Sequence, residues 1–192
     1  RLASDLRNGL FFLIFPRTYS PFDEEPVGET VYMDILNRAK KYVHIMTPYL
    51  IIDQSMITAL TFAAKRGVDV KLILPHIPDK KFAFALAKSH YKELLKAGVR
   101  IYEYTPGFVH AKIFTSDDEK AVVGTINLDY RSLYLHFECA AFLYQVEEIA
   151  EIEKDFQRTL EKCQEVTPEN RKKGTFFLRL EGWLLKWLAP LM

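Results

Sequence analysis

Residues 107–112 of this chain read Gly-Phe-Val-His-Ala-Lys, and Asp117, Gly124, Thr125 and Asn127 follow them closely. The stretch brings an imidazole, an ammonium, a hydroxyl and a carboxamide within a few residues of one another. Such groups together can hold a tetrahedral phosphate, and a neutral imidazole nitrogen can attack its phosphorus atom. The stretch therefore predicts a phosphoryl-transfer site.

The first part of this site is predicted to lie on a strand. Residues 108–115 are rich in β-branched and aromatic side chains, which is typical of a strand. Side chains two residues apart on a strand point to the same face, so we expect His110 and Lys112 on one face.

A second polar pair is predicted beside the first. Residues 121–123 continue as a strand, and the turn at 117–118 would fold it back against its predecessor. Thr125 and Asn127, again two apart, follow this second strand. Lysine and asparagine would stabilise the equatorial phosphoryl oxygens in the transition state, and this chemistry requires neither a metal nor a cofactor.

Helical and strand-like segments alternate along the chain, which favours an α/β fold with a mixed, mostly parallel sheet flanked by helices. Asp53 is a good N-cap, and Gly67 and Gly98 are good helix ends. The predicted helices cover 30–41, the segment from the Asp53 cap to 66, 80–97 and 146–164. The predicted strands, besides those above, cover 42–47, 68–74, 99–104 and 138–144.

The spacing His-x-Lys-x4-Asp-x6-Gly-Thr-x-Asn resembles the HKD motif of the phospholipase D superfamily. From about residue 31 to 142, and above all in 102–112 and 124–132, the chain is similar to the C-terminal catalytic half of bacterial cardiolipin synthases. The resemblance implies a phospholipase D-like sandwich over 22–166, preceded by a linking segment over 1–21.

The resemblance also implies roles for the motif residues. His110 would form a phosphohistidine, or would protonate the leaving alcohol. Lys112 and Asn127 would bind the phosphoryl oxygens. Asp117 would orient the motif through local hydrogen bonds rather than touch the substrate.

Further residues are implied around the motif. Gly124 and Thr125 would help to bind the substrate, with Thr125 where many relatives carry serine. Glu138 would hydrogen-bond the catalytic imidazole, which fixes its tautomer and stabilises its charged form. His136 stands where many relatives carry asparagine, a change that the position should tolerate. Arg131 either contacts a phosphate or pairs with a neighbouring carboxylate.

The resemblance implies an enzyme that makes cardiolipin and glycerol from two phosphatidylglycerol molecules. Two alternatives stay open: hydrolysis by a phospholipase D or a nuclease-type phosphodiesterase, and an inert interaction half without its partner domain. A net charge of only +1 speaks against a nucleic-acid partner. Because such a site needs two HKD motifs, we expect either an N-terminal HKD half of the same protein or a second copy of the chain as partner.

Residues 167–192 have a different character. They predict a basic, amphipathic helix that places Phe177, Trp183 and Trp187 in a membrane interface; docking onto the domain or onto its missing half is the alternative. The apolar run at 9–15 is too short to span a bilayer. The resemblance implies a protein associated with the bacterial cytoplasmic membrane, whose spanning segments lie outside this chain.

Overall fold

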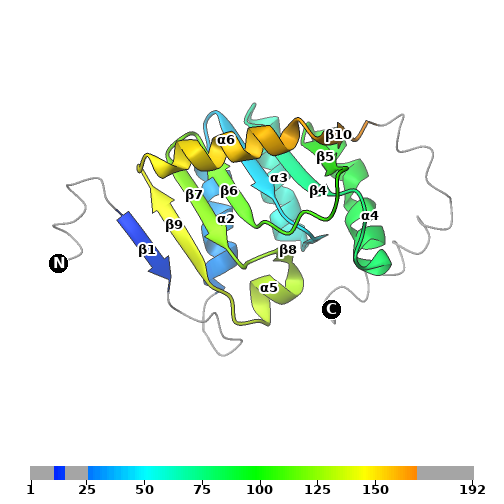
Figure 1. The fold of residues 1–192 in the computed structure, drawn as a ribbon, viewed down its shortest axis with the longest axis horizontal. Helices are drawn as coiled ribbons and strands as arrows, with labels where there is room; N and C mark the ends of the chain where they lie inside the picture. Colours follow the sequence, from blue (N-terminus) through cyan, green and yellow to red (C-terminus); the bar gives the residue numbers. More distant parts are fainter. Residues whose placement is uncertain (1–10, 16–25, 168–192) are drawn as a thin grey trace.

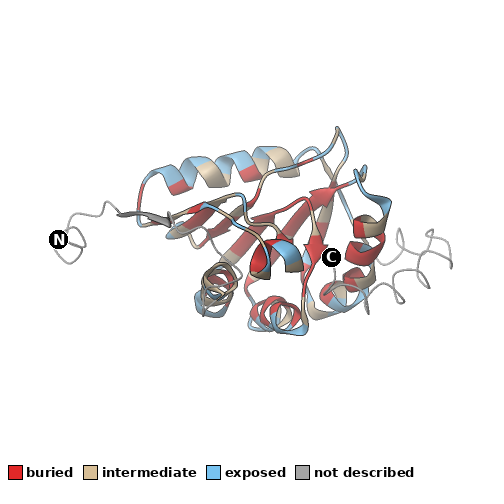
Figure 2. Cartoon of the chain, turned by 90° about the horizontal axis from the view of Figure 1, so that it is seen from below, coloured by how far each residue is buried: buried red, intermediate tan, exposed pale blue. Residues whose placement is uncertain are grey.

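The computed structural model describes residues 26–167 and the backbone of 11–15, and it shows a sheet between two layers of helices (Figure 1). Helix α6 covers one face of the sheet, and α2, α3 and α4 cover the other (Figure 2). The helices are α2 (Val27–Arg38), α3 (Gln54–Lys65), α4 (Lys81–Ala97), α5 (Tyr130–Tyr134) and α6 (Glu148–Leu160). The strands are β1 (Phe11–Phe15), β2 (Tyr42–Met46), β3 (Leu50–Ile51), β4 (Asp69–Pro75), β5 (Arg100–Tyr104), β6 (Ile113–Ser116), β7 (Lys120–Gly124), β8 (Leu128–Asp129), β9 (Ala140–Tyr144) and β10 (Cys163–Glu165).

Eight strands form the main sheet in the order β1-β9-β7-β6-β2-β4-β5-β10, and β3 pairs with β8 beside it. The predicted α/β class and the mixed sheet flanked by helices are confirmed. Within the main sheet, the β2–β4 and β4–β5 pairs are parallel, and the other neighbouring strands are antiparallel. The sheet is therefore less parallel than the sequence predicted, because short connections join β6 to β7 and reverse the chain there.

The structure confirms the predicted helix start at Asp53 and the predicted helix end at Gly98. The Asp53 carboxylate accepts a hydrogen bond from the backbone N–H of Met56 at 2.9 Å, as an N-cap does. Gly98 ends α4 in the left-handed conformation, with φ of 98°, which a residue without Cβ adopts at little cost.

Two predicted elements are shorter than expected. The segment before Ile113 is not a strand, because the register Met46–Ile113 ends the pairing of β6 with β2, and Pro48 follows with no N–H to donate. The predicted helix 146–164 ends at Leu160, and Cys163–Glu165 instead pairs antiparallel with β5. Strand β1, within the predicted linking segment, pairs antiparallel with β9.

Strand alternation divides the core between the two faces of the sheet. The face under α2, α3 and α4 buries large apolar side chains such as Ile45, Leu72 and Phe114, and Leu60 of α3 is fully buried against this cluster. The face under α6 has a smaller apolar cluster around Phe156. Figure 2 shows the buried strands between the two layers of helices.

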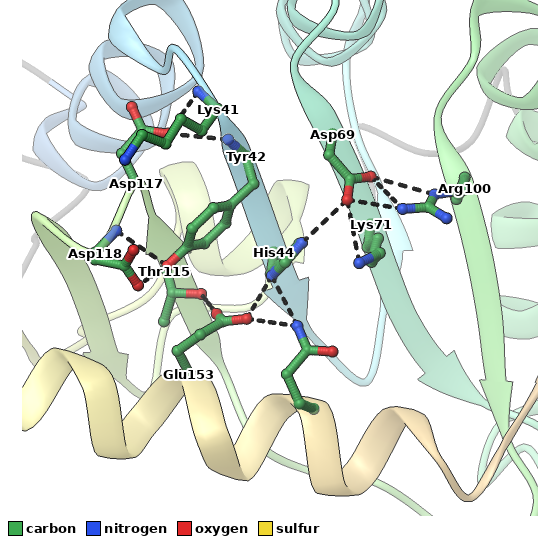
Figure 3. A network of polar contacts seen from close by, with 11 residues as sticks. Lys41, Tyr42, His44, Asp69, Lys71, Arg100, Thr115, Asp117, Asp118 and Glu153 are labelled. Atoms are coloured by element: carbon green, nitrogen blue, oxygen red, sulfur yellow. Dashed lines mark hydrogen bonds and ion pairs between the residues drawn. The ribbon is translucent and has the colours of Figure 1, made fainter.

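A partly buried polar network holds α6 on its face of the sheet (Figure 3). The Glu153 carboxylate of α6 contacts His44 Nδ1 of β2 at 2.7 Å and accepts the Thr115 hydroxyl of β6 at 2.5 Å. The His44 ring stacks on Phe156 at a centroid distance of 4.8 Å. Burial of Glu153 acts to raise its pKa, but its hydrogen bonds outweigh burial and the net pKa lies below the ordinary value. The carboxylate therefore stabilises the fold at neutral pH, and this stabilisation is lost as the pH falls through the lowered pKa.

Gly124 allows β7 to meet β9 at the start of the candidate site. A Cβ at this position would lie 2.3 Å from the Cys139 carbonyl oxygen and 2.5 Å from the Ala140 Cα. Both atoms belong to backbone that is fixed by the register of the two strands. No side chain fits here without moving one of the strands.

We expect Gly124→Ala to lower the free energy of unfolding by roughly 3 kcal/mol, because the new methyl group overlaps backbone that cannot move aside. Urea denaturation followed by circular dichroism measures this loss. Gly107→Ala is the matched control, since a Cβ there meets nothing within 4 Å. Equal stability of the two variants would contradict the close approach.

Candidate active site

The strand directions gather the predicted site residues at one edge of the main sheet. The carboxyl ends of β2, β4 and β5 lie at this edge because these strands are parallel. The start of β6, the end of β7 and the start of β9 lie there too, because each of these strands runs antiparallel to its predecessor in the sheet. The segments 107–112 and 125–139 therefore emerge side by side.

His110 and Lys112 differ in their exposure to solvent. His110 is exposed, and its ring lies 5.8 Å from that of Phe108 between centroids. The Lys112 side chain is buried, and its Nζ donates a hydrogen bond to the His110 carbonyl oxygen at 2.6 Å. The irregular backbone before β6 thus combines an accessible imidazole with a buried ammonium that is bonded to the backbone of the same histidine.

The electrostatics of Lys112 are set by burial and by two carboxylates. Burial lowers its pKa, and the charges of Glu138 and Asp129 act in the opposite direction. The net pKa lies below that of a free lysine. A desolvated ammonium of this kind interacts more strongly with an anion than a solvated one does.

Thr125 is fixed against the start of β9. Its backbone N–H donates to the Cys139 carbonyl at 2.9 Å, and its Oγ1 accepts from the Cys139 N–H at 2.9 Å. The Thr125 hydroxyl donates to the Glu138 carboxylate. This bond holds Glu138 at the edge of the site, while the expected bond from Glu138 to the His110 imidazole stays a prediction.

His136 and Arg131 form a contact that the sequence did not predict. Arg131 Nε donates to His136 Nε2, so the His136 ring accepts at this nitrogen and carries its proton on Nδ1. That Nδ1 lies 3.9 Å from Glu138 Oε1. Both side chains therefore belong to the surroundings of Glu138.

Asn127 is anchored by a residue of α5. Its Nδ2 donates to the Ser132 hydroxyl at 3.0 Å, and its Oδ1 is buried with no hydrogen-bond partner among the described residues. Ser132 in turn donates its N–H to the Asp129 carboxylate at 2.6 Å, which caps α5. Sequence reasoning missed Ser132, although Asp129 three residues before it is an N-cap signal.

Thr47 connects the loop after β2 to the candidate site. Its buried hydroxyl accepts the Leu128 N–H at 3.2 Å and donates to the Tyr49 carbonyl at 3.1 Å. The loop after β2 is thereby tied to β8, immediately after Asn127.

The family model described as the PLD-like domain of cardiolipin synthase matches residues 32–160. The chain belongs to this family. It is 42% identical over 161 residues to a cardiolipin synthase of Clostridium perfringens, covering 84% of this chain and 34% of that protein. For a cardiolipin synthase of Halalkalibacterium halodurans, the identity is 37% over 166 residues, with coverages of 86% and 33%. An uncharacterised protein of Streptococcus mutans is 58% identical over 179 residues, with coverages of 93% and 39%.

The chain thus spans between a third and two fifths of the length of these relatives. Two solved structures share its fold. Phosphatidylserine synthase of Haemophilus influenzae matches with a TM-score of 0.65 and 17% identity, over 85% of this chain and 42% of that one. Nuc of Salmonella typhimurium, a phospholipase D family member, matches with a TM-score of 0.63 and 17% identity, over 72% and 90%.

Asp117 of this PLD-like domain lies at the far end of β6 from Lys112, roughly 16 Å away at about 3.3 Å per residue. Its carboxylate accepts the backbone N–H groups of Lys41 and Tyr42 at 2.8 and 2.9 Å (Figure 3). It also accepts the backbone N–H of Lys40 at 2.7 Å. These partners are remote in sequence, not local as expected. Asp117 therefore clamps the turn before β2 to the turn after β6. Its effect on the motif is indirect, because it fixes the position of β6.

Some expectations concern residues that the structure does not describe. The predicted amphipathic helix with Phe177, Trp183 and Trp187 lies in 168–192, outside the described residues. Within the described part of the PLD-like domain, none of the helices has the length and hydropathy needed to cross a bilayer. Residues 26–167 also contain no cluster of three or more His, Cys, Asp or Glu side chains that could hold a metal ion.

We expect Asp117→Asn to lower the free energy of unfolding by about 2 kcal/mol, because an amide NH₂ would replace one of the oxygens that accept backbone N–H groups. Asp118→Asn is the matched control. The neighbouring Asp118 receives the Tyr42 hydroxyl on a single oxygen, which an asparagine retains. Thermal unfolding of both variants tests the difference, and a loss of the same size in both would show that Asp117 is no clamp.

Proposed function

We propose that this PLD-like domain transfers a phosphatidyl group from one phosphatidylglycerol to the hydroxyl of a second, which yields cardiolipin and glycerol. The observation that carries the proposal is the exposed His110 imidazole together with the buried Lys112 ammonium, which bonds the His110 carbonyl, in a chain of the cardiolipin synthase family. His110 supplies a nucleophile, and Lys112 supplies an electrostatic site for the phosphate.

The proposed reaction has two displacement steps. In the first, an imidazole nitrogen of His110 forms a bond to phosphorus while the bond from phosphorus to the glycerol headgroup oxygen breaks; the leaving oxygen takes a proton from the histidine of a second HKD motif. In the second, the hydroxyl of another phosphatidylglycerol attacks the phosphohistidine and loses its proton to that second histidine. The nitrogen–phosphorus bond breaks and His110 is regenerated.

The surroundings of His110 support stabilisation of the transition state. Lys112 has three N–H donors, of which one binds the His110 carbonyl, so two can turn toward phosphoryl oxygens. Asn127 can contribute as well. A half-turn of its amide would let the Ser132 hydroxyl donate to Oδ1, and would put two N–H donors where a buried oxygen now lacks a partner.

Glu138 is proposed to orient the reacting imidazole. Its carboxylate is held by the Thr125 hydroxyl and lies close enough to Lys112 to influence that pKa. An imidazole N–H of His110 that donates to this carboxylate would stabilise the charged ring.

The proposed enzyme needs a second HKD motif, because one histidine cannot serve as both nucleophile and acid in the same step. The relatives are about three times as long as the part that this chain matches, so they have room for another such domain. The partner is either an N-terminal HKD half of the same protein or a second copy of this chain. Because the substrate is a phospholipid, the proposed location is the bacterial cytoplasmic membrane.

Phosphatidylglycerol vesicles incubated with the purified protein test the reaction, with lipid products identified by mass spectrometry. We expect cardiolipin and glycerol, no turnover by His110→Ala, and a loss of about 3 kcal/mol of transition-state stabilisation in Lys112→Ala. His76→Ala is the control, since His76 is an exposed histidine in the loop after β4.

Phosphatidic acid as the main product would show that the protein is a hydrolase rather than a transferase. No product from the chain alone, followed by activity on adding a separate HKD domain from a relative, would show that one chain cannot complete the site. Wild-type rates in His110→Ala would rule the site out.

The lowered pKa of Lys112 predicts the alkaline limit of the reaction. The ammonium must be protonated to bind phosphate, and its pKa lies below 10.5, so kcat/KM should fall as the pH rises through that lowered value. Lys112→Arg should react more slowly and lose this alkaline limb, because a guanidinium stays charged. A pH–rate profile of both proteins measures the effect; an unchanged alkaline limb in Lys112→Arg would assign it to another group.

A further inference from the structure

The short segment between α5 and β9 alternates between exposed and sheltered side chains. Leu135 and Phe137 are 45% and 65% exposed, whereas His136 and Glu138 are less exposed. Only 9% of the Glu138 side chain is open to solvent, and the His136 ring lies against it. This segment therefore places a histidine and a carboxylate side by side at the edge of the candidate active site.

The Glu138 carboxylate is contacted at both of its oxygens. The Thr125 hydroxyl donates to Oε2, and His136 Nδ1 lies 3.9 Å from Oε1. The terminal bond of a glutamate rotates over a broad range, so a single contact leaves the plane of the carboxylate free to turn. Contacts at both oxygens restrict this rotation.

Arg131 sets the tautomer of His136. A guanidinium has only donors, so the His136 Nε2 that accepts from Arg131 Nε must carry a lone pair, and the ring proton is on Nδ1. That N–H faces Glu138 Oε1. A separation of 3.9 Å is longer than a direct hydrogen bond, so this contact is electrostatic. The charge of the guanidinium strengthens it, because linked polar groups polarise one another.

Glu138 also acts on the groups that would perform the reaction. Its charge opposes the effect of burial on the pKa of Lys112, so it favours the charged ammonium. In the proposed reaction, the same carboxylate accepts an imidazole N–H of His110. Each carboxylate oxygen has more than one lone pair, so the contacts with Thr125 and His136 leave an acceptor for that bond.

We propose that His136 is a positioning residue, which holds the Glu138 carboxylate in the orientation that His110 requires. The inference rests on the proposed function and adds to it a residue that acts through another side chain. A carboxylate that accepts one imidazole N–H keeps the lone pair on the other nitrogen, and it stabilises the charge that the ring gains when it attacks. The effect of His136 therefore reaches the nucleophile through Glu138.

Two substitutions separate the polar contacts of His136 from its shape. Asparagine and leucine are nearly equal in shape, but only asparagine retains a donor and an acceptor. In the phosphatidylglycerol assay, His136→Asn should keep a kcat close to that of the wild type. His136→Leu should lower kcat roughly 10- to 100-fold with little change in KM, because a misplacement of about 1 Å has an effect of this size.

His76→Leu is the matched control for the leucine variant. The His76 side chain is 46% exposed, against 44% for His136, and its Nδ1 likewise faces a carboxylate, that of Glu103 at 2.8 Å. We expect a wild-type kcat from this variant. Circular dichroism confirms the fold of each protein.

Carbethoxylation by diethyl pyrocarbonate measures the same effect without any lipid. The reagent acylates an unprotonated imidazole nitrogen, and peptide mapping by mass spectrometry gives separate rates for His110 and His76. His76 is the reference within each sample. The ratio of the His110 rate to the His76 rate should fall severalfold in His136→Leu and in Glu138→Gln, and should stay at the wild-type value in His136→Asn.

Nitrogen-15 NMR tests the tautomer on which the proposal depends. The ring signals that disappear in His136→Asn belong to His136, and we expect them to show a protonated Nδ1 and an unprotonated Nε2. If His136→Leu does not fold, Arg131→Leu removes the same contacts from their exposed end and should lower the carbethoxylation ratio as well. A proton on Nε2, or equal carbethoxylation ratios in the polar and apolar variants, would overturn the proposal.

The two proposals can fail separately. Wild-type protein that leaves phosphatidylglycerol unreacted, while the carbethoxylation ratio depends on residue 136 as expected, contradicts the transfer reaction but retains the positioning of His110. Cardiolipin formed at equal rates by the wild type, His136→Asn and His136→Leu contradicts only the role of His136.

Discussion

The position of the site depends on one constraint, the antiparallel pairing of β6 with the central strand β2. The register that sets Met46 opposite Ile113 fixes where pairing stops. Beyond this register, the chain from 107 to 112 is free of ladder hydrogen bonds with β2. It can therefore place His110 in solvent and Lys112 in the interior. An extended strand would have put His110 and Lys112 on the same face, with similar exposure.

The surroundings of that pairing are built to keep it in register. Asp117 ties the end of β6 to the start of β2, and Gly124 lets β7 approach β9 so closely that Thr125 bonds the backbone of Cys139. On the face under α6, Glu153 bonds β2 and β6 together through His44 and Thr115. A partly buried carboxylate with several hydrogen bonds is costly to break but specific in its geometry, so it holds these two strands in one alignment.

Much of this architecture could be predicted from local sequence. Asp53 and Gly98 act on the backbone within one helical turn, so their capping roles follow from residue type. The predictions that were wrong have a common origin: the true structure there depends on contacts between distant segments. Residues 108–112 have strand-like composition, yet a strand needs a partner, and β2 ends before reaching them. Residues 163–165 continue the helical pattern of α6, yet they pair with the exposed edge of β5.

The sequence by itself determined the α/β class and the family, because the motif spacing and the alternation of elements are properties of the chain in order. It also named the groups that can perform phosphoryl transfer. Only the tertiary structure decided how they are arranged: that Lys112 is buried and His110 exposed, that Asp117 works from the far end of a strand, and that Arg131 bonds His136. The physical reason is that desolvation and hydrogen bonding across strands arise from residues far apart in the chain, and no local pattern records which of them will meet.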